Sequence, residues 1–160
     1  MKVTVHTDGA SRPHTDNLGG YAAVLEWNGK RKAVAGSAQN TTNNRMELMG
    51  ALAAFRAIKK FIGQKCDVHV TSDSEYVVLG MSKRVRGWQA TGWRTAAKKP
   101  VKNQDLWIDL VHAASRHKVT WTWTRGHADC EENNLADKLA NEAIEKLRKK
   151  LGTAQGDCDE

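Results

Sequence analysis

The sequence predicts an α/β fold, in which a mixed sheet of three antiparallel strands followed by two parallel ones is flanked by helices. Two observations carry this prediction. Three strand-like segments occupy residues 2–39, and the later strand-like segments, 66–72 and 118–125, each follow a helical segment. Because strands separated by a helix pair in parallel through right-handed crossovers, we expect the element order βββ, α, β, α, α, β, α.

The three N-terminal strands are predicted from alternation and from a turn. Residues 2–8 alternate apolar and polar side chains and stop at Asp-Gly, which predicts a strand followed by a turn. Residues 19–27 and 30–39 flank Asn28-Gly29, the strongest short hairpin signal. Together these segments predict an antiparallel meander.

The helices are predicted from apolar residues at intervals of three and four. From Asn43 onward one face of a helix is apolar, with Glu47 beside the stripe formed by Leu48, Leu52, Phe55, Ile58 and Ile62. Further helices are expected over 74–81, 105–116 and 134–150. We expect residues 1–150 to form one domain and residues 151–160, which contain three acids and no base, to be a disordered tail.

The composition of the chain limits the classes of molecule that it is expected to bind. A net charge of +7 over 160 residues favours a polyanion, with nucleic acid ahead of an anionic membrane surface. The three cysteines, Cys66, Cys130 and Cys158, form no CxxC pair and have no regular histidine spacing, so neither a disulfide framework nor a structural zinc site is indicated. The chain has no apolar segment typical of a signal peptide or membrane span, so we expect a cytoplasmic protein without membrane contact. It gives no sign of a partner protein, and we expect a monomer.

Four acids are candidates for a functional site, although each has an ordinary structural explanation. Asp8 fits a turn, Glu47 a first helical turn, Asp73 a helix cap shared with Ser74, and Asp137 a solvated helix face. Asp8 and Asp73 both follow predicted strands, and ligands in such sheets bind beyond the carboxyl ends of strands. The case therefore depends on their combination.

Nine short motifs supply that combination. They are "TDG" at 7–9, "GGY" at 19–21, "TTNNRMEL" at 41–48, "SDS" at 72–74, "GW" at 87–88 and at 92–93, "KKPVKNQDLW" at 98–107, "GHA" at 126–128, and "AD" before "LA" at 136–140. In these motifs, their order and their spacing, residues 1 to about 148 resemble bacterial type 1 ribonuclease H.

The resemblance implies a ribonuclease H-like fold with a five-stranded mixed sheet. It implies an endoribonuclease that hydrolyses the RNA strand of RNA/DNA hybrids by a two-metal-ion mechanism, leaving 5′-phosphate and 3′-hydroxyl ends. The implied catalytic and metal-binding acids are Asp8, Glu47, Asp73 and Asp137, and His127 is implied to move protons. Carboxylates suit two Mg²⁺ ions, with Mn²⁺ as a substitute, and no small-molecule cofactor is expected.

A basic segment is the candidate for substrate binding. Residues 83–102 contain seven basic residues and no acid. A solvated basic helix is the ordinary explanation, but the interleaved Trp88 and Trp93 favour a nucleic-acid surface. The resemblance implies that this protrusion grips the DNA strand of the hybrid. The implied substrate-binding residues are Thr42, Asn43, Asn44, Glu75, Trp88, Trp93, Lys98, Lys99 and Asn103.

Three segments depart from the pattern of the resembling family. Residues 9–18 lack its Gly-Asn-Pro-Gly-Pro run, which leaves Asn17 as the one contact we suggest there. Glu75 replaces a common Gln, and "ADCEENN" replaces the usual Gly-His-Pro run after the loop histidine. None of these changes removes a candidate metal ligand.

Three alternatives remain open at the level of sequence. A non-catalytic hybrid-binding module would keep the basic segment and lose acids, whereas all four are present. Another nuclease or an integrase on the same fold would not be expected to carry "KKPVKN". A membrane-surface protein is the weakest alternative, because the basic run is broken by Gly and Pro and lacks a broad apolar face.

Overall fold

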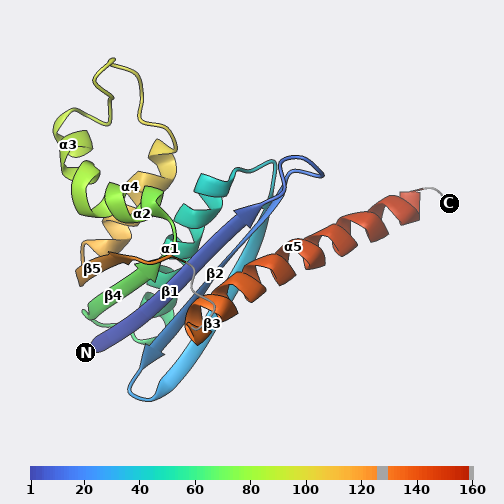
Figure 1. Ribbon diagram of the computed structural model, residues 1–160, viewed down its shortest axis with the longest axis horizontal. Coiled ribbons are helices and arrows are strands. Elements are labelled where there is room, and N and C mark those ends of the chain that lie inside the picture. The colour runs from blue at the N-terminus through green and yellow to red at the C-terminus, as the bar shows by residue number, and fades with distance from the viewer. Residues whose placement is uncertain (126–129, 159–160) are drawn as a thin grey trace.

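One five-stranded sheet, in the order β3-β2-β1-β4-β5, forms the centre of the molecule (Figure 1). The computed structural model describes the backbone of residues 1–125 and 130–158 and the side chains of these residues as far as Gly152. The strands are β1 (Lys2–Ser11), β2 (Leu18–Trp27), β3 (Lys30–Gln39), β4 (Asp67–Ser72) and β5 (Lys118–Trp123). The pairs β1–β2 and β2–β3 are antiparallel, and β1–β4 and β4–β5 are parallel. The predicted mixed sheet is confirmed.

The first strand is longer than the sequence predicts. The expected turn at Asp8-Gly9 is wrong, because β1 continues through it and pairs with β2 as far as Ser11↔Gly19. The predicted hairpin is confirmed: Asn28 and Gly29 have φ angles of 48° and 72° between the β2 and β3 strands. Both residues take the positive φ that a tight two-residue hairpin requires.

The helices follow the predicted order with changed ends. They are α1 (Asn43–Phe61), α2 (Glu75–Leu79), the π-helical turn η1 (Gly80–Arg84), α3 (Val85–Ala90), α4 (Gln104–Ala114) and α5 (Glu131–Cys158). The predicted helix over 74–81 is extended by η1 and α3 to Ala90. The widened turn starts where the Trp107 ring packs on Gly80 so closely that a Cβ atom there would lie 2.0 Å from it.

The last helix is also longer than predicted at both ends. It begins at Glu131, not near Asn134, and continues to Cys158 rather than ending near Lys150. Two acids in its first turn, Glu131 and Glu132, suit the positive end of the helix dipole. The division of the chain into one domain of residues 1–150 and a disordered acidic tail of residues 151–160 stays a prediction.

The sheet separates two helical layers. Ala23 and Leu25 of β2 belong to the core that α1 and α4 cover, with Trp107 fully buried in it. Gly20, Ala22 and Val24 point to the opposite face, where α5 packs so closely that a Cβ atom on Gly20 would lie 2.2 Å from the Ala140 carbonyl oxygen. Figure 1 shows α5 crossing β1, β2 and β3 on one side of the sheet with α1 on the other. Within the described residues, no helix combines the length and apolar character needed to cross a bilayer.

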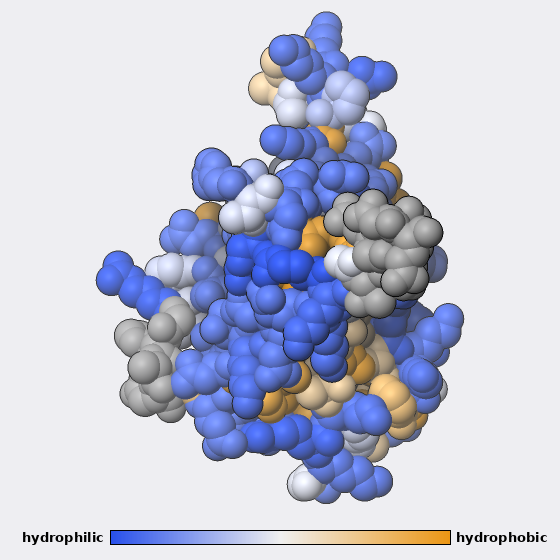
Figure 2. Space-filling model, turned by 90° about the vertical axis from the view of Figure 1, so that its right-hand side faces the viewer, coloured by the Kyte–Doolittle hydropathy of each residue, from blue (hydrophilic) through white to orange (hydrophobic). Residues whose placement is uncertain are grey.

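The connection between α3 and α4 projects from the body of the protein. It forms the loop at the top of Figure 1, and Figure 2 shows the same projection as a mainly hydrophilic surface. We call residues 83–102 the basic protrusion. Its outer loop is shaped by an isolated bridge between Arg94 and Pro100 and by a hydrogen bond from the Val101 amide to the Trp93 carbonyl oxygen at 2.9 Å.

Candidate active site

Two acids lie side by side where β1 and β4 stop pairing. The parallel register of these strands ends at Thr7↔Ser72, so Asp8 and Asp73 are the next residue on each strand. Asp73 does not cap α2: the Ser74 hydroxyl does so, accepting from the Val77 amide at 3.3 Å. The side chain of Asp73 is therefore available for another role.

Glu47 reaches the same place because α1 approaches β1 unusually closely. A Cβ atom on Gly9 would lie 2.3 Å from the backbone carbon of Met46, and one on Gly50 would lie 2.9 Å from the Asp8 carbonyl oxygen. Glycine at both positions permits this backbone contact. Glu47 is only 6% exposed and lies in the second turn of a helix that Thr42 caps, so the first-turn explanation is wrong.

The structure brings all four candidate acids together. One carboxylate oxygen each of Asp8, Glu47 and Asp73 lie within 4.8 Å of one another. Asp137 joins them from the exposed side of α5, close enough to Asp8 to raise the pKa of that carboxyl. The Asn141 side chain contacts the Asp137 carboxylate, donating to Oδ1 at 3.4 Å as well as to the backbone carbonyl oxygen of Asp137 at 2.9 Å. We call these four residues the acidic cluster.

In the acidic cluster, burial and neighbouring charges raise the pKa values of three carboxyl groups. Burial raises the pKa of Asp8 to about 7, and the charge of Asp73 and the hydrogen bond with Asp137 add to the effect. Burial also raises the pKa of Glu47 to about 9, aided by the charges of Asp8 and Asp73. The pKa of Asp73 is raised as well, mainly by burial. Grouped carboxylates with shifted pKa values are typical of functional sites.

The donor set fits a divalent cation. Glu47 Oε2 and Asp73 Oδ1 are buried and have no hydrogen-bond partner among the described residues. Oxygen-only ligands are those preferred by hard cations such as Mg²⁺ and Ca²⁺. A cation there would satisfy the orphaned oxygens and offset the repulsion among the acids.

A polar network joins the start of α1 to the start of α4. Asn103, with a φ of 60°, donates from Nδ2 to the Tyr76 hydroxyl at 3.0 Å, and the Trp107 indole donates to the same oxygen at 3.0 Å. The Arg45 guanidinium donates to Asn103 Oδ1 at 3.3 Å and to both Asp105 carboxylate oxygens at 3.0 and 2.8 Å. This network fixes Asn103 beside the N-terminus of α1.

Sequence reasoning missed Arg45 and Tyr76 in this network. Arg45 lies inside the motif "TTNNRMEL", which was the one available signal, but its partners are distant in the sequence. The candidate contacts Thr42, Asn43 and Asn44 are exposed at the same helix end. The structure thus places them and Asn103 on one rim.

The two candidate tryptophans serve the fold as well. Trp88 and Trp93 are half-buried, with ring centroids 6.1 Å apart, and Trp88 packs on Trp107 at 5.2 Å. Their tilted packing on each other and on Trp107 of the core anchors the basic protrusion. In contrast, Lys98 and Lys99 are exposed in a tight turn closed by two hydrogen bonds with the Thr95 backbone, both 2.8 Å long.

The remaining candidates lie around the acids. Glu75 is exposed as the first residue of α2, two residues beyond Asp73. Asn17 has a φ of 57°, and its carbonyl oxygen accepts from the Thr41 amide at 3.4 Å, next to the cap of α1. His127 lies outside the described residues.

The changed loop after β1 is tied to α5. The Arg12 guanidinium donates to Asn141 Oδ1, and Asp16 forms an ion pair with Arg148 at 2.6 Å. Because Asn141 also holds Asp137, this loop supports the exposed edge of the acidic cluster. The loop of residues 9–18, which lacks the family's Gly-Asn-Pro-Gly-Pro run, therefore has a structural role of its own in this protein.

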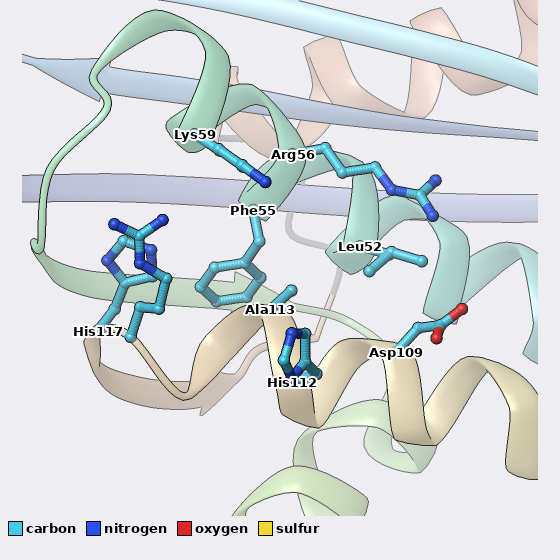
Figure 3. Close-up of a pocket in the computed structure, with 9 residues that line it drawn as sticks. Leu52, Phe55, Arg56, Lys59, Asp109, His112, Ala113 and His117 are labelled. Atoms are coloured by element: carbon cyan, nitrogen blue, oxygen red, sulfur yellow. The ribbon is translucent and has the colours of Figure 1, made fainter.

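A pocket away from the acidic cluster lies between two helices. Figure 3 shows it between α1 and α4, with a volume of about 290 Å³. It is lined by Leu52, Phe55, Arg56, Lys59, Asp109, His112, Ala113, Arg116 and His117. In the acidic cluster Asp8 and Glu47 are each 6% exposed, whereas Asp137 lies in the open.

The mixed sheet and the acids at its carboxyl-terminal edge define the ribonuclease H-like class of proteins. The class fixes no substrate by itself. The sequence profile of the family described as RNase H matches residues 1–145, and the chain belongs to this family.

Individual proteins of similar sequence carry the same family name. The chain is 44% identical over 145 residues to "Ribonuclease H" of Francisella philomiragia subsp. philomiragia, covering 91% of this chain and 92% of that protein. It is 44% identical over 146 residues to "Ribonuclease H" of Francisella tularensis subsp. novicida, covering 91% and 93%.

Solved structures show the same fold. LC9-RNase H1, described as a type 1 RNase H with the type 2 active-site motif, has a TM-score of 0.80 and 35% identity over 91% of this chain and 72% of that one. LC11-RNase H1, crystallised with an RNA/DNA hybrid, has a TM-score of 0.69 and 22% identity over 91% and 98%, which shows the fold alone.

The raised pKa of Asp8 has a consequence for stability. Since the folded state holds this proton up to about pH 7 and the unfolded state releases it near pH 4, the metal-free protein should lose stability as pH rises through this range. We expect Asp8→Asn to raise the free energy of unfolding at pH 8 by roughly 1–3 kcal/mol in chelator, with the difference shrinking towards pH 4. Urea denaturation at both pH values measures this.

The matched control is Asp67→Asn, which neutralises an exposed acid at the other end of the parallel strands. It should leave the pH dependence of stability as in the parent protein. A constant difference between Asp8→Asn and the parent from pH 4 to pH 8 would contradict the electrostatic account.

Proposed function

We propose that this protein is a magnesium-dependent ribonuclease H that hydrolyses the RNA strand of RNA/DNA hybrids as an endonuclease. The observation that carries the proposal is the convergence of Asp8, Glu47 and Asp73 within 4.8 Å, with Asp137 close enough to Asp8 to raise the pKa of that carboxyl. Membership of the RNase H family and the names of the Francisella relatives support the same reaction.

The four acids would hold the metal. Asp8 is central, since it contacts Asp137 and lies beside Glu47 and Asp73. Two Mg²⁺ ions, or Mn²⁺ in their place, would supply the positive charge that favours attack by water and departure of the 3′ oxygen. The scissile phosphate would lie at the exposed edge of the cluster, near Asp137. Cleavage there would leave 5′-phosphate and 3′-hydroxyl ends.

Proton movement is assigned to His127. This residue lies outside the described part of the chain, so its proposed role depends on the family's "GHA" setting. An imidazole titrating near neutrality can carry a proton to or from the reacting oxygens. We rank it as a catalytic residue below the four acids.

The hybrid would lie across the rim and the basic protrusion. Thr42 and Asn103 are proposed to hold a DNA phosphate, Asn43 and Asn44 to contact the duplex, and the basic protrusion to grip the DNA strand through Lys98 and Lys99. Trp88 and Trp93 would contribute their accessible edges. Such contacts read backbone and shape, so little sequence preference follows, and the 2′-hydroxyl would select the strand to be cut.

Glu75 gives the site one unusual feature. It adds an exposed negative charge beside Asp73, where a neutral contact to the hybrid would otherwise be expected.

We further propose that the protein acts as a monomer in the cytoplasm.

A catalytic role for the acids predicts loss of cleavage with retained binding. We expect Asp8→Asn to lower the rate of Mg²⁺-dependent cleavage of end-labelled hybrid by about 1,000-fold or more, since a lost metal interaction costs several kcal/mol. Affinity for the hybrid, measured by fluorescence anisotropy, should change little. Single-stranded and double-stranded RNA should stay uncut.

Asp67→Asn serves again as the control and should cleave like the parent protein. Equal cleavage by Asp8→Asn and the parent would overturn the metal assignment. Tight hybrid binding by the parent without any cleavage would instead favour the binding-module alternative.

The basic protrusion predicts a salt effect. Replacing Lys98 and Lys99 by Ala should weaken hybrid binding and reduce the slope of log K against log salt by about 1 for each phosphate contact removed. The matched pair is Lys59 and Lys60 of α1, exposed neighbours outside the basic protrusion, whose replacement should leave the slope unchanged. An unaltered slope in the Lys98 and Lys99 variant would remove them from the interface.

A further inference from the structure

A second group of potential metal ligands lies apart from the acidic cluster. His6 of β1, Cys130 before α5 and Glu132 in the first turn of α5 each offer one ligand atom, and these atoms lie within 4.8 Å of one another. Cys130 Sγ is 3.8 Å from Glu132 Oε2. Their chemistry differs from that of the acidic cluster, because nitrogen, sulfur and oxygen are each represented once.

The fold explains how residues so distant in sequence meet. His6 pairs with Val24 across the β1–β2 ladder, and Val24 points to the face that α5 covers. His6 therefore faces the start of α5, which carries Glu132. The group is a product of packing between a strand and a helix, and its side chains are half-buried.

The ion pairs around the three residues leave one oxygen of Glu132 available to a metal ion. Arg31 pairs with Glu132 Oε1 at 3.3 Å and also with Glu131 at 3.2 Å and Glu26 at 3.4 Å. The other oxygen, Oε2, faces Cys130. A cation can thus take Oε2 without breaking the contact between Arg31 and Oε1.

One ring nitrogen of His6, the buried Nδ1 atom, lacks a hydrogen-bond partner among the described residues. The neighbouring His69 is engaged elsewhere, with its Nε2 atom 3.2 Å from the Thr122 hydroxyl. A buried ring nitrogen without a partner is costly unless something binds it.

We propose that His6, Cys130 and Glu132 form a zinc site, with water as the fourth ligand. Imidazole, thiolate and carboxylate are the three ligand types that zinc accepts, whereas Mg²⁺ prefers oxygen alone. Binding converts the Cys130 thiol to a thiolate and releases its proton to solvent. The ion bridges β1 and the start of α5, and it holds Cys130, the residue that follows segment 126–129, against the sheet.

Cobalt spectroscopy tests this site without any cleavage assay. One equivalent of Co²⁺ added to the reduced full-length protein should give a thiolate-to-cobalt charge-transfer band and the intense visible bands of tetrahedral cobalt. Zn²⁺ should abolish both by displacement, and excess Mg²⁺ should not. Cys130→Ser should lose the charge-transfer band. Glu132→Gln should keep the band and bind Zn²⁺ at least tenfold more weakly, as losing a supporting partner alone typically costs about 10- to 100-fold.

Two controls separate this site from other metal-binding groups. Cys158→Ser should keep the charge-transfer band, and so should Asp8→Asn, because the acidic cluster contains no thiol. Absence of the band in the parent protein, or its persistence in Cys130→Ser with near-normal circular dichroism, would overturn the zinc site. Loss of the band in Cys158→Ser would also overturn it.

Discussion

Burial of several carboxylates close together, where β1 and β4 stop pairing, is the constraint on which the rest of the site depends, and repulsion among their charges adds to its cost. Two like charges about 4 Å apart repel by roughly 4 kcal/mol at an effective dielectric constant near 20. The fold holds Asp8 and Asp73 together by strand register and brings Glu47 to them by backbone contact at Gly9 and Gly50. The hydrogen bonds of the sheet and the close packing of α1 thus supply the energy that keeps the acids in place. A bound cation would offset the repulsion among their charges.

The same helix serves both cleavage and recognition. α1 carries Glu47 in its second turn, and its exposed N-terminus carries Thr42 and its neighbours. Arg45 links that end to Asn103, and through Tyr76 and Trp107 the network continues into the core beneath the basic protrusion. A duplex held by the rim and the basic protrusion therefore has a fixed position relative to the acids. Which phosphate is cut would follow from this geometry and not from base sequence.

The order of strands and helices was predictable because alternation, helical periodicity and the Asn28-Gly29 turn are local signals. The grouping of the four acids was implied by the resemblance to bacterial type 1 ribonuclease H that the motifs carry, not by any local pattern. Other features depend on contacts between distant residues, which local patterns do not carry. Asp8 pairs with Ala22 of β2 inside the strand, the Trp107 ring packs on Gly80 where the π-helical turn begins, and Trp88 packs on Trp107. Cysteine spacing gave no sign of zinc for the same reason, since His6 and Cys130 meet only through packing of α5 on the sheet.

The most direct measurement of the central claim is a carboxyl-carbon NMR titration of the side chains of Asp8 and Glu47, with and without Mg²⁺. Without metal, we expect Asp8 to titrate near pH 7 and Glu47 near pH 9. With saturating Mg²⁺, both titrations should move to distinctly lower pH, because metal and proton compete for the same oxygens. Ordinary carboxyl pKa values near 4 without metal, unchanged by Mg²⁺, would contradict a strained acidic cluster relieved by a divalent cation.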